Sequence, residues 1–244
     1  MRDRFFVEGI HAVGERVALA ADDARKIATV LRKRSGDRVQ IVDSGGVAYG
    51  ATVDVDDRSV HATLDELLDR GEVETTLRVT IAQALPKGQK MDLVVEKATE
   101  LGAAAIVPVR SARVVGHDTS PAKVERWRRI AKSAAQQSGR LHVPEVADVC
   151  DWEALLATFD RHDRVYVPWE LASPSPLRDV FEHELSDATS VLIVIGPEGG
   201  FSSDEIVLAQ QSGGRAISLG RRILRTETAA LVVLSAILYA RGEL

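Results

Sequence analysis

The stretch IGPEGGFS at residues 195–202 decides the fold, because it joins a buried strand to a helix. Residues 191–195 form a short, continuously apolar run, which is typical of a strand covered on both faces. Ser202 and Glu205 have the spacing of a capping box, so a helix should begin directly after the loop. This order predicts the carboxyl edge of a parallel α/β sheet.

The glycines of this loop suit a ligand site. Gly199 and Gly200 can both adopt positive φ angles, and the helix that follows offers unpaired N–H groups. The loop does not match the GxGxxG dinucleotide fingerprint, and Lys87 and Gly88 lack the remainder of a Walker A motif. Nucleotide-phosphate binding is therefore disfavoured. Taken alone, the glycines are equally consistent with a structural turn.

A second loop, LGRRILRTETA at residues 219–229, has the same position between a strand and a helix. Residues 216–219 predict the strand, and Thr226 is expected to be the N-cap of the final helix. The two loops should therefore face one crevice at the carboxyl edge of the sheet. Arg225 and Glu227 would lie at that helix start, where a salt bridge between them is the simplest structural alternative to a functional role.

Outward from these loops, strands alternate with helices as far back as residue 75, which indicates a parallel sheet. Strands are predicted at 77–85, 105–109 and 164–167. Gly102 has the C′ position of one helix, and Pro121 begins a basic helix that should end near Gly139.

The first seventy residues read differently, mainly as strands. Residues 37–43 and 47–55 predict a β-hairpin. Asp22 is expected to cap a short helix with Ile27, Val30 and Leu31 on one side. The chain therefore divides into a small β-barrel-like domain, 1–72, and an α/β domain, 73–244.

The composition is that of a globular protein of 244 residues, with a formal net charge of −5. Eight carboxylates and two arginines between Val53 and Glu74 carry −6, so the remainder of the chain carries +1. Basic residues gather at 123–140 and 215–225, where they are either phosphate-facing or simply solvated. The single Cys150 excludes a disulfide framework and a cysteine-rich zinc site, and no metal is expected.

No apolar run is long enough to span a membrane, and the N-terminus lacks the apolar region of a secretory signal. No contact with a membrane is expected. The sequence therefore predicts a cytoplasmic protein.

Several segments together resemble one family. The motifs IGPEGGFSSDEI and LGRRILRTETAA, preceded by VVEKATELGAAAIVPVRSARV and RWRRIAKSAAQQSGRLHVP, are similar to the RsmE family of ribosomal RNA uridine-N3 methyltransferases, in the SPOUT superfamily. Near the N-terminus, RFFV and VLRKRSGDRVQIVDSGG look like the PUA-like RNA-binding barrel of that family. The chain departs from the family at Ala28, where members often have a histidine.

This resemblance implies a trefoil-knotted α/β domain, one of the exceptions to the rule against knots. It also implies a homodimer with the C-terminal helix at the interface, and S-adenosylmethionine as cofactor. The expected substrate is a uridine in the decoding-region helix of 16S ribosomal RNA, within the 30S subunit. By motif match, the cofactor would be bound by Gly196, Glu198, Gly199, Gly200, Leu219, Gly220, Ile223 and Leu224.

Methylation of N3 requires the proton of that nitrogen to leave. Arg225 is expected to stabilise negative charge on the uracil, while Glu227 orients Arg225 or receives the proton. RNA phosphates would be bound by Arg32, Arg34, Arg128, Arg129, Lys132 and Arg140. Two alternatives remain open: a SPOUT enzyme that methylates a ribose 2′-oxygen, and a non-catalytic RNA-binding assembly factor of the same fold.

Overall fold

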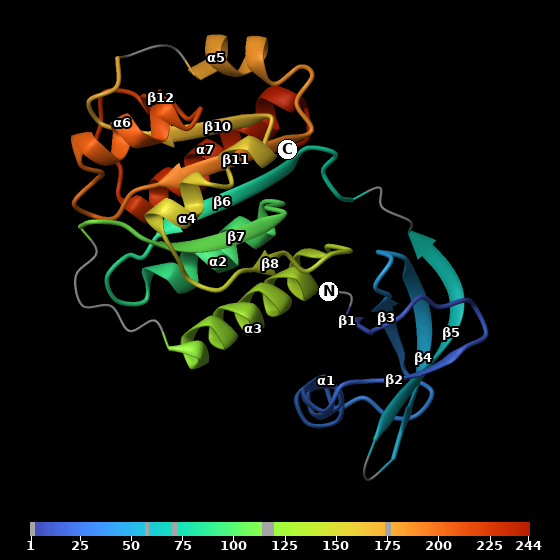
Figure 1. Ribbon diagram of the computed structural model, residues 1–244. Coiled ribbons are helices and arrows are strands. Elements are labelled where there is room, and N and C mark those ends of the chain that lie inside the picture. The colour runs from blue at the N-terminus through green and yellow to red at the C-terminus, as the bar shows by residue number, and fades with distance from the viewer. Residues whose placement is uncertain (1–2, 57–58, 70–72, 114–119, 174–176) are drawn as a thin grey trace. The chain divides into compact units, whose positions relative to one another are not determined.

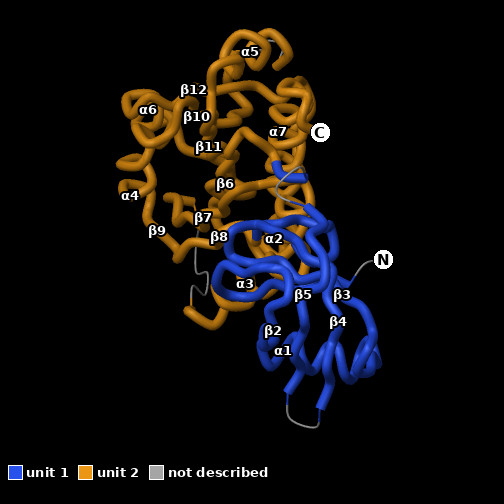
Figure 2. The backbone as a smooth tube through the Cα atoms, turned by 90° about the vertical axis from the view of Figure 1, so that its right-hand side faces the viewer, with its two compact units in different colours: residues 1–74, 135–142 blue, residues 75–134, 143–244 orange. Residues whose placement is uncertain are grey.

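The computed structural model describes residues 3–56, 59–69, 73–113, 120–173 and 177–244 (Figure 1). Four charged residues of the acidic stretch, Asp57, Arg58, Arg70 and Glu72, lie outside the described residues. The chain forms two compact units, coloured separately in Figure 2. Unit 1 contains residues 1–74 and 135–142, and unit 2 contains residues 75–134 and 143–244. The predicted boundary at 72/73 falls close to this division, but the inclusion of 135–142 in unit 1 was not predicted.

Unit 1 is built on a five-stranded sheet of order β1-β3-β4-β5-β2. Its strands are β1 (Arg4–Phe6), β2 (Arg16–Ala18), β3 (Arg38–Val42), β4 (Ala48–Val55) and β5 (Val60–Asp69). Strands β3 and β4 pair antiparallel, which confirms the predicted hairpin. Alternate residues of these strands point inward, so Phe5, Ile41, Tyr49 and Leu64 are buried together in one core.

The helix of unit 1 differs from the prediction in two ways. It consists of α1 (Ala21–Arg25) and the π-helical segment Lys26–Val30. Ala20, not Asp22, is the N-cap, and no side chain caps the helix. Ile27 is fully buried, whereas Val30 is 71% exposed, so the prediction of a shared apolar face was wrong for Val30. A π-helix is wider than an α-helix, and the three-residue spacing therefore does not return to the same face.

A buried ion pair connects the segment 135–142 to the end of the segment 1–74 within unit 1. Glu74 and Arg140 approach to 2.7 Å, with side chains that are 13% and 8% exposed. The Glu74 carboxylate also accepts hydrogen bonds from the backbone N–H groups of Leu141 and His142. Burial by itself raises the pKa of the Glu74 carboxyl. The hydrogen bonds and positive charge of Arg140, with the backbone hydrogen bonds, outweigh this effect and hold the pKa below its usual value. Arg140 thus has a structural role within this unit.

Unit 2 is built on a sheet in which every pairing is parallel, with the order β12-β10-β11-β6-β7-β8 and β9 paired with β7. Its strands are β6 (Arg78–Ala84), β7 (Ala105–Arg110), β8 (Glu145–Val146), β9 (Cys150–Asp151), β10 (Arg164–Pro168), β11 (Ser190–Ile195) and β12 (Arg215–Ile217). The predicted strands are confirmed, with β12 beginning one residue early and ending two residues early.

Helices cover both faces of this sheet. They are α2 (Lys90–Glu100), α3 (Pro121–Ser138), α4 (Trp152–Leu156), α5 (Leu177–Glu184), α6 (Ser203–Gln211) and α7 (Thr226–Arg241), with a 3₁₀ turn at Phe159–Arg161. Val191 and Ile193 of β11 pack in the core with α2, α5 and α7, whereas Leu192 and Val194 pack on the opposite face with α4 and α6. This alternation confirms that the strand is buried on both sides.

Helix α7 crosses back from the edge strand. It follows β12, yet it packs against α2, α5, β6 and β11. The residues that face this core are Ala230, Val233, Leu234, Ile237 and Leu238. Its N-cap is Arg225 rather than the predicted Thr226, which is the first helical residue. No helix in the described ranges is long and apolar enough to cross a membrane.

Candidate active site

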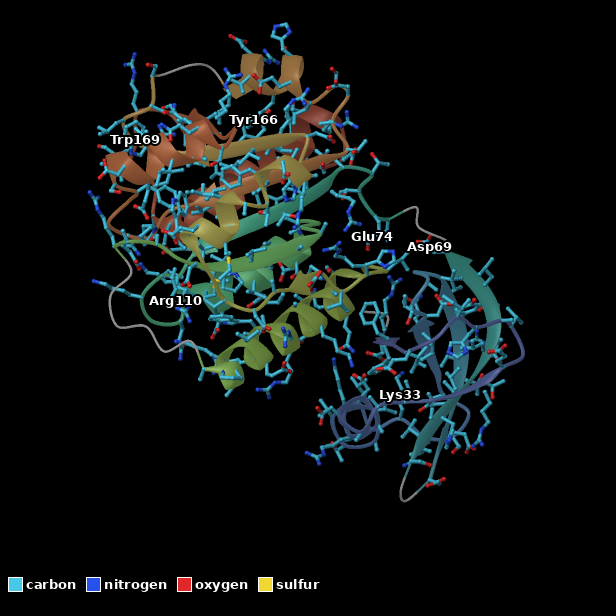
Figure 3. All side chains as sticks on the ribbon, viewed as in Figure 1. Lys33, Asp69, Glu74, Arg110, Tyr166 and Trp169 are labelled. Carbon is cyan, nitrogen blue, oxygen red and sulfur yellow. The ribbon has the colours of Figure 1, made fainter. Side chains whose placement is uncertain are left out.

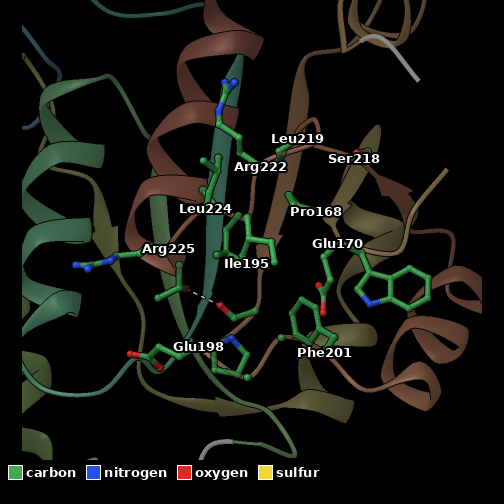
Figure 4. Close-up of a pocket in the computed structure, with 18 of the residues that line it drawn as sticks. Pro168, Glu170, Ile195, Glu198, Phe201, Ser218, Leu219, Arg222, Leu224 and Arg225 are labelled. Atoms are coloured by element: carbon green, nitrogen blue, oxygen red, sulfur yellow. Dashed lines mark hydrogen bonds between the residues drawn. The ribbon is translucent and has the colours of Figure 1, made fainter. Parts of the chain in front are cut away.

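A pocket of about 790 Å³ opens at the carboxyl ends of β10, β11 and β12. It is lined by residues 168–170, 195–201 and 218–226, together with Lys90 and Ala229. Figure 4 shows labelled side chains from all three segments around it. Because strands β10, β11 and β12 are parallel neighbours, the loops that follow them meet at one edge, as ligand sites in such sheets do.

The pocket brings together the two predicted loops. All eight residues predicted to bind the cofactor line it, and so does Arg225. Glu227 is not in the lining. Its side chain lies at the start of α7 and is 11% exposed. The residues predicted to bind RNA phosphates lie elsewhere in the chain's two units.

The two glycines of the first loop differ in conformation. Gly200 uses the positive φ that glycine permits, with a value of +65°, whereas Gly199 does not adopt a positive φ. A Cβ atom on Gly200 would lie 2.8 Å from Oε1 of Glu170, so this carboxylate would have to shift. The positive φ angle is therefore the main reason why the loop favours glycine at position 200.

A buried chain of hydrogen bonds ties the two loops to the sheet. Nε2 of Gln83, at the end of β6, donates to Oγ1 of Thr226 at 2.8 Å. That hydroxyl donates in turn to the carbonyl oxygen of Gly196 at 2.5 Å. Gln83 is fully buried and Thr226 is 6% exposed. These two hydrogen bonds connect β6, the first loop and the start of α7, and so hold both loops in place.

The helix after the first loop is held equally firmly. Ser202 and Glu205 form the predicted capping box, in which each side chain bonds the backbone N–H of the other residue. Glu205 also accepts a hydrogen bond from the backbone N–H of Ala112 at 2.9 Å. The helix start that directly follows the first loop is therefore fixed by hydrogen bonds from two sides.

Lys90 lies between carboxylates from both loops. Its Nζ donates to Oε1 of Glu198 at 2.8 Å and lies 3.7 Å from Oε2 of Glu227. The hydrogen bond to Glu198 raises the pKa of Lys90. Burial opposes the charge of Glu198, but hydrogen bonds from Lys90 and the backbone lower the pKa of this carboxyl below its usual value. The pair is therefore charged at neutral pH.

Arg225 and Glu227 do not pair with each other. Arg225 is exposed, and its side chain forms no hydrogen bond or ion pair within the described ranges. Glu227 is 9% exposed, and its buried Oε2 has no hydrogen-bond partner there. The simple structural alternative, a salt bridge between the two, was therefore wrong. In Figure 4 Arg225 and Glu198 extend to the same side of the pocket, whereas Arg222 points elsewhere.

Sequence reasoning missed Lys90, Trp169 and Glu170. A usable signal existed for Lys90, because it is the first residue of α2, where a cation opposes the helix dipole. Trp169 and Glu170 follow β10, and Figure 3 shows Trp169 near the end of that strand. Only the strand order reveals that this end lies beside the two loops.

The predicted phosphate ligands differ in availability. Arg32, which has a φ of 53°, and Arg34 are exposed in unit 1, and Arg129 is exposed on α3. Arg128 forms ion pairs with Glu125 and Asp148, and Lys132 is half-buried. Arg140 is 6% exposed and neutralised by Glu74, so a phosphate would have to displace that carboxylate. The prediction for Arg140 is therefore not supported by its surroundings.

The arrangement can hold a ligand by backbone and apolar groups and place charged groups beside it. An exposed arginine and two carboxylates held by one lysine are suited to a substrate that develops negative charge and loses a proton. No cluster of three metal-ligating side chains occurs among the residues described.

Comparison with known proteins agrees with this geometry. Residues 73–238 match the family described as RNA methyltransferase domain. The ribosomal RNA small subunit methyltransferase E of Bacillus subtilis is 37% identical over 91% of this chain and 89% of its own length. The protein of the same name from Mycobacterium bovis is 32% identical over 96% of this chain and 90% of its own length.

Solved structures are similar over nearly the whole chain. The ribosomal RNA small subunit methyltransferase E of Neisseria gonorrhoeae, bound to S-adenosyl methionine, is 29% identical with a TM-score of 0.87 and covers 98% of both chains. A putative methyltransferase of Legionella pneumophila, in complex with the same cofactor, is 27% identical with a TM-score of 0.83 and also covers 98% of both. The chain therefore belongs to the RsmE family of RNA methyltransferases.

Proposed function

We propose that this protein uses S-adenosylmethionine to methylate N3 of a uridine in the decoding-region helix of 16S ribosomal RNA, within the 30S subunit. The observation that carries the proposal is the position of Arg225, Glu227 and Lys90 beside a pocket formed by the two family loops. The proposal rests as well on relatives named for the small ribosomal subunit.

The pocket fits this cofactor. Its volume of about 790 Å³ lies within the range of small-molecule sites, and much of its wall is glycine backbone and apolar side chain. We place the adenosine between the loop at 196–200 and the loop at 219–224. The bound cofactor supplies a methyl group already activated on a sulfonium, so the protein needs mainly to position the two reactants.

The residues beside the pocket supply the other requirement, which is removal of the N3 proton. Glu227 accepts that proton, and Arg225 donates hydrogen bonds to the uracil oxygens as negative charge develops there. Glu227 could either accept the proton or orient Arg225. Because the side chains of Arg225 and Glu227 do not contact each other, we favour the role of Glu227 as proton acceptor. The target base must leave its stack to expose this edge.

RNA binding is assigned to exposed and half-buried cations of each unit. Arg32 and Arg34 of unit 1 and Arg128, Arg129 and Lys132 of unit 2 would contact phosphates. Unit 1, with its five-stranded sheet, would be the PUA-like RNA-binding domain. We also infer that the crossing from β12 to α7 is threaded as a trefoil knot, that the protein is a homodimer through α7, and that it works in the cytoplasm.

The decisive experiment incubates unmodified 30S subunits with the protein and labelled S-adenosylmethionine, followed by mass analysis of the nucleosides and mapping of the label. We expect 3-methyluridine at one position in the decoding region. A 2′-O-methylated nucleoside would instead support the second target class. Calorimetry that detects no binding of the cofactor would support a non-catalytic assembly factor.

Replacement of Arg128, Arg129 and Lys132 by alanine should weaken binding to 30S subunits and reduce its salt dependence, because fewer counterions are released. The affinity for S-adenosylmethionine should not change. Binding is measured over a series of salt concentrations, with Arg178→Ala on α5 as a control that removes an exposed cation elsewhere. An unaltered salt slope in the triple variant would assign these residues to an ordinary solvated surface.

A further inference from the structure

We propose that Lys90 is a positioning residue of the reaction centre, which holds the carboxylate of Glu227 in the place from which it accepts the N3 proton. This inference rests on the proposed function and adds a residue from outside both cofactor loops. The sequence motifs gave Lys90 no role.

The contacts of Lys90 join three separate segments. Lys90 begins α2, Glu198 belongs to the first loop, and Glu227 belongs to the start of α7. The ammonium donates to Glu198 at 2.8 Å and approaches Oε2 of Glu227 to 3.7 Å. Its side chain is 33% exposed, and Lys90 lines the pocket. One cation therefore fixes two carboxylates at the site where the reactants meet.

Glu227 depends on this cation more than Glu198 does. Glu198 also accepts a hydrogen bond from the backbone N–H of Lys87 at 3.0 Å. Oε2 of Glu227 is enclosed, and no hydrogen bond reaches it from any residue that the structure describes. A nearly buried carboxylate is costly unless a charge compensates it, and Lys90 is the cation paired with it here.

The position of Lys90 is difficult to explain by helix stability. A positive charge at the first residue of a helix opposes the macrodipole, whereas Asp or Glu is favoured there. The aliphatic stem and ammonium instead reach across to the carboxylates of the two loops. Lysine at this position therefore serves the pocket rather than α2.

In the proposed step, Glu227 takes the proton from N3 of the uracil. The electron pair released on the nitrogen forms the new bond to the methyl carbon, and the electrons of the broken carbon–sulfur bond remain on sulfur as a neutral thioether. The proton passes from Glu227 to solvent after the product leaves. Lys90 stays protonated throughout, and its charge, 3.7 Å from Oε2, favours one orientation of the carboxylate.

The test is single-turnover methylation of 30S subunits with protein and S-adenosylmethionine in excess. Lys90→Met should lower the saturated rate about 10- to 100-fold, the range for loss of one charge-assisted contact. Lys90→Arg should restore most of the rate, because it also places a cation between the two carboxylates. Calorimetry should show little change in cofactor affinity, and thermal unfolding checks that each variant folds.

Lys87→Met is the matched control, because it removes a neighbouring cation but leaves the backbone N–H that bonds Glu198. Its rate should equal that of the wild type. A double variant, Lys90→Met with Glu227→Gln, should be no slower than Glu227→Gln alone, since Lys90 acts through Glu227.

Two results would overturn the inference. If saturating cofactor restores the rate of Lys90→Met, Lys90 only fastens the first loop. If the rate of the double variant falls by the product of the two single-variant decreases, Lys90 acts independently of Glu227, for example by direct contact with the base. A failure of the proposed function would be recognised separately, because the wild-type protein would then form no 3-methyluridine, and the role of Lys90 would fail with it.

Discussion

Arg225→Ala is expected to lower the single-turnover rate of methylation about 10²- to 10³-fold, as the loss of one oxyanion donor does at other sites. Arg225 is an exposed residue of the pocket wall without an ion pair in the described part of the chain, so its guanidinium is available to a substrate. The contact strengthens only as charge develops on the uracil. Binding of cofactor and 30S subunits should therefore change much less than the rate.

Two further variants define the role of Arg225. Arg225→Lys should recover only part of the rate, because an ammonium cannot reproduce the planar fork of guanidinium donors. Arg222→Ala removes the same charge from the same loop but from a side chain that points elsewhere (Figure 4), and it should retain most of the rate. If Arg225→Ala reaches the wild-type rate once RNA is saturating, Arg225 is a phosphate ligand and not a catalytic residue.

Gly200→Val is expected to weaken the binding of S-adenosylmethionine by about 10- to 10²-fold, because a β-branched residue in this backbone region is strained by about 1–3 kcal/mol. The φ angle of Gly200 is +65°, and its new Cβ would lie 2.8 Å from the Glu170 carboxylate. The Glu170 carboxylate can move aside, so the backbone strain at position 200 is what would displace the loop. Calorimetry on the folded variant measures the loss directly.

Gly213→Val provides the control for backbone strain. Gly213 has a φ of +97°, and a Cβ there would meet nothing within 4 Å. It lies after α6 and does not line the pocket in which we place the cofactor. It should therefore destabilise the fold without a comparable loss of cofactor affinity. Unchanged cofactor affinity in Gly200→Val would contradict the placement of the cofactor against this loop.

The local signals in the sequence were reliable where neighbouring residues decide the structure. The capping box at Ser202 and Glu205 and the C′ position of Gly102 are both present in the structure. The prediction failed at Val30, since the change from α- to π-helix there depends on tertiary packing that no local pattern records. It also failed at Thr226, whose hydroxyl bonds Gly196, a residue 30 positions earlier.

In the candidate site, too, local motifs were predicted correctly and long-range pairings were not. The residues of the two loops could be named from their motifs, because glycines and capping residues at fixed spacing specify a strand-to-helix turn. Arg140 could not be assigned, because its pairing with Glu74 joins residues 66 positions apart in sequence. A basic residue in a basic segment looks the same whether it faces solvent or a buried carboxylate.

The sequence by itself determined the parallel α/β unit, the preceding β-rich unit and the two loops that form the pocket, because periodicity and turn chemistry are local properties of the chain. Only the tertiary structure decided which charges meet there. The strand order β12-β10-β11-β6 brings the end of β10 between the loops, and the packing of α2 against α7 brings Lys90 to Glu227. Pairing over such separations depends on how elements pack, and a charge pattern read along the chain does not contain that information.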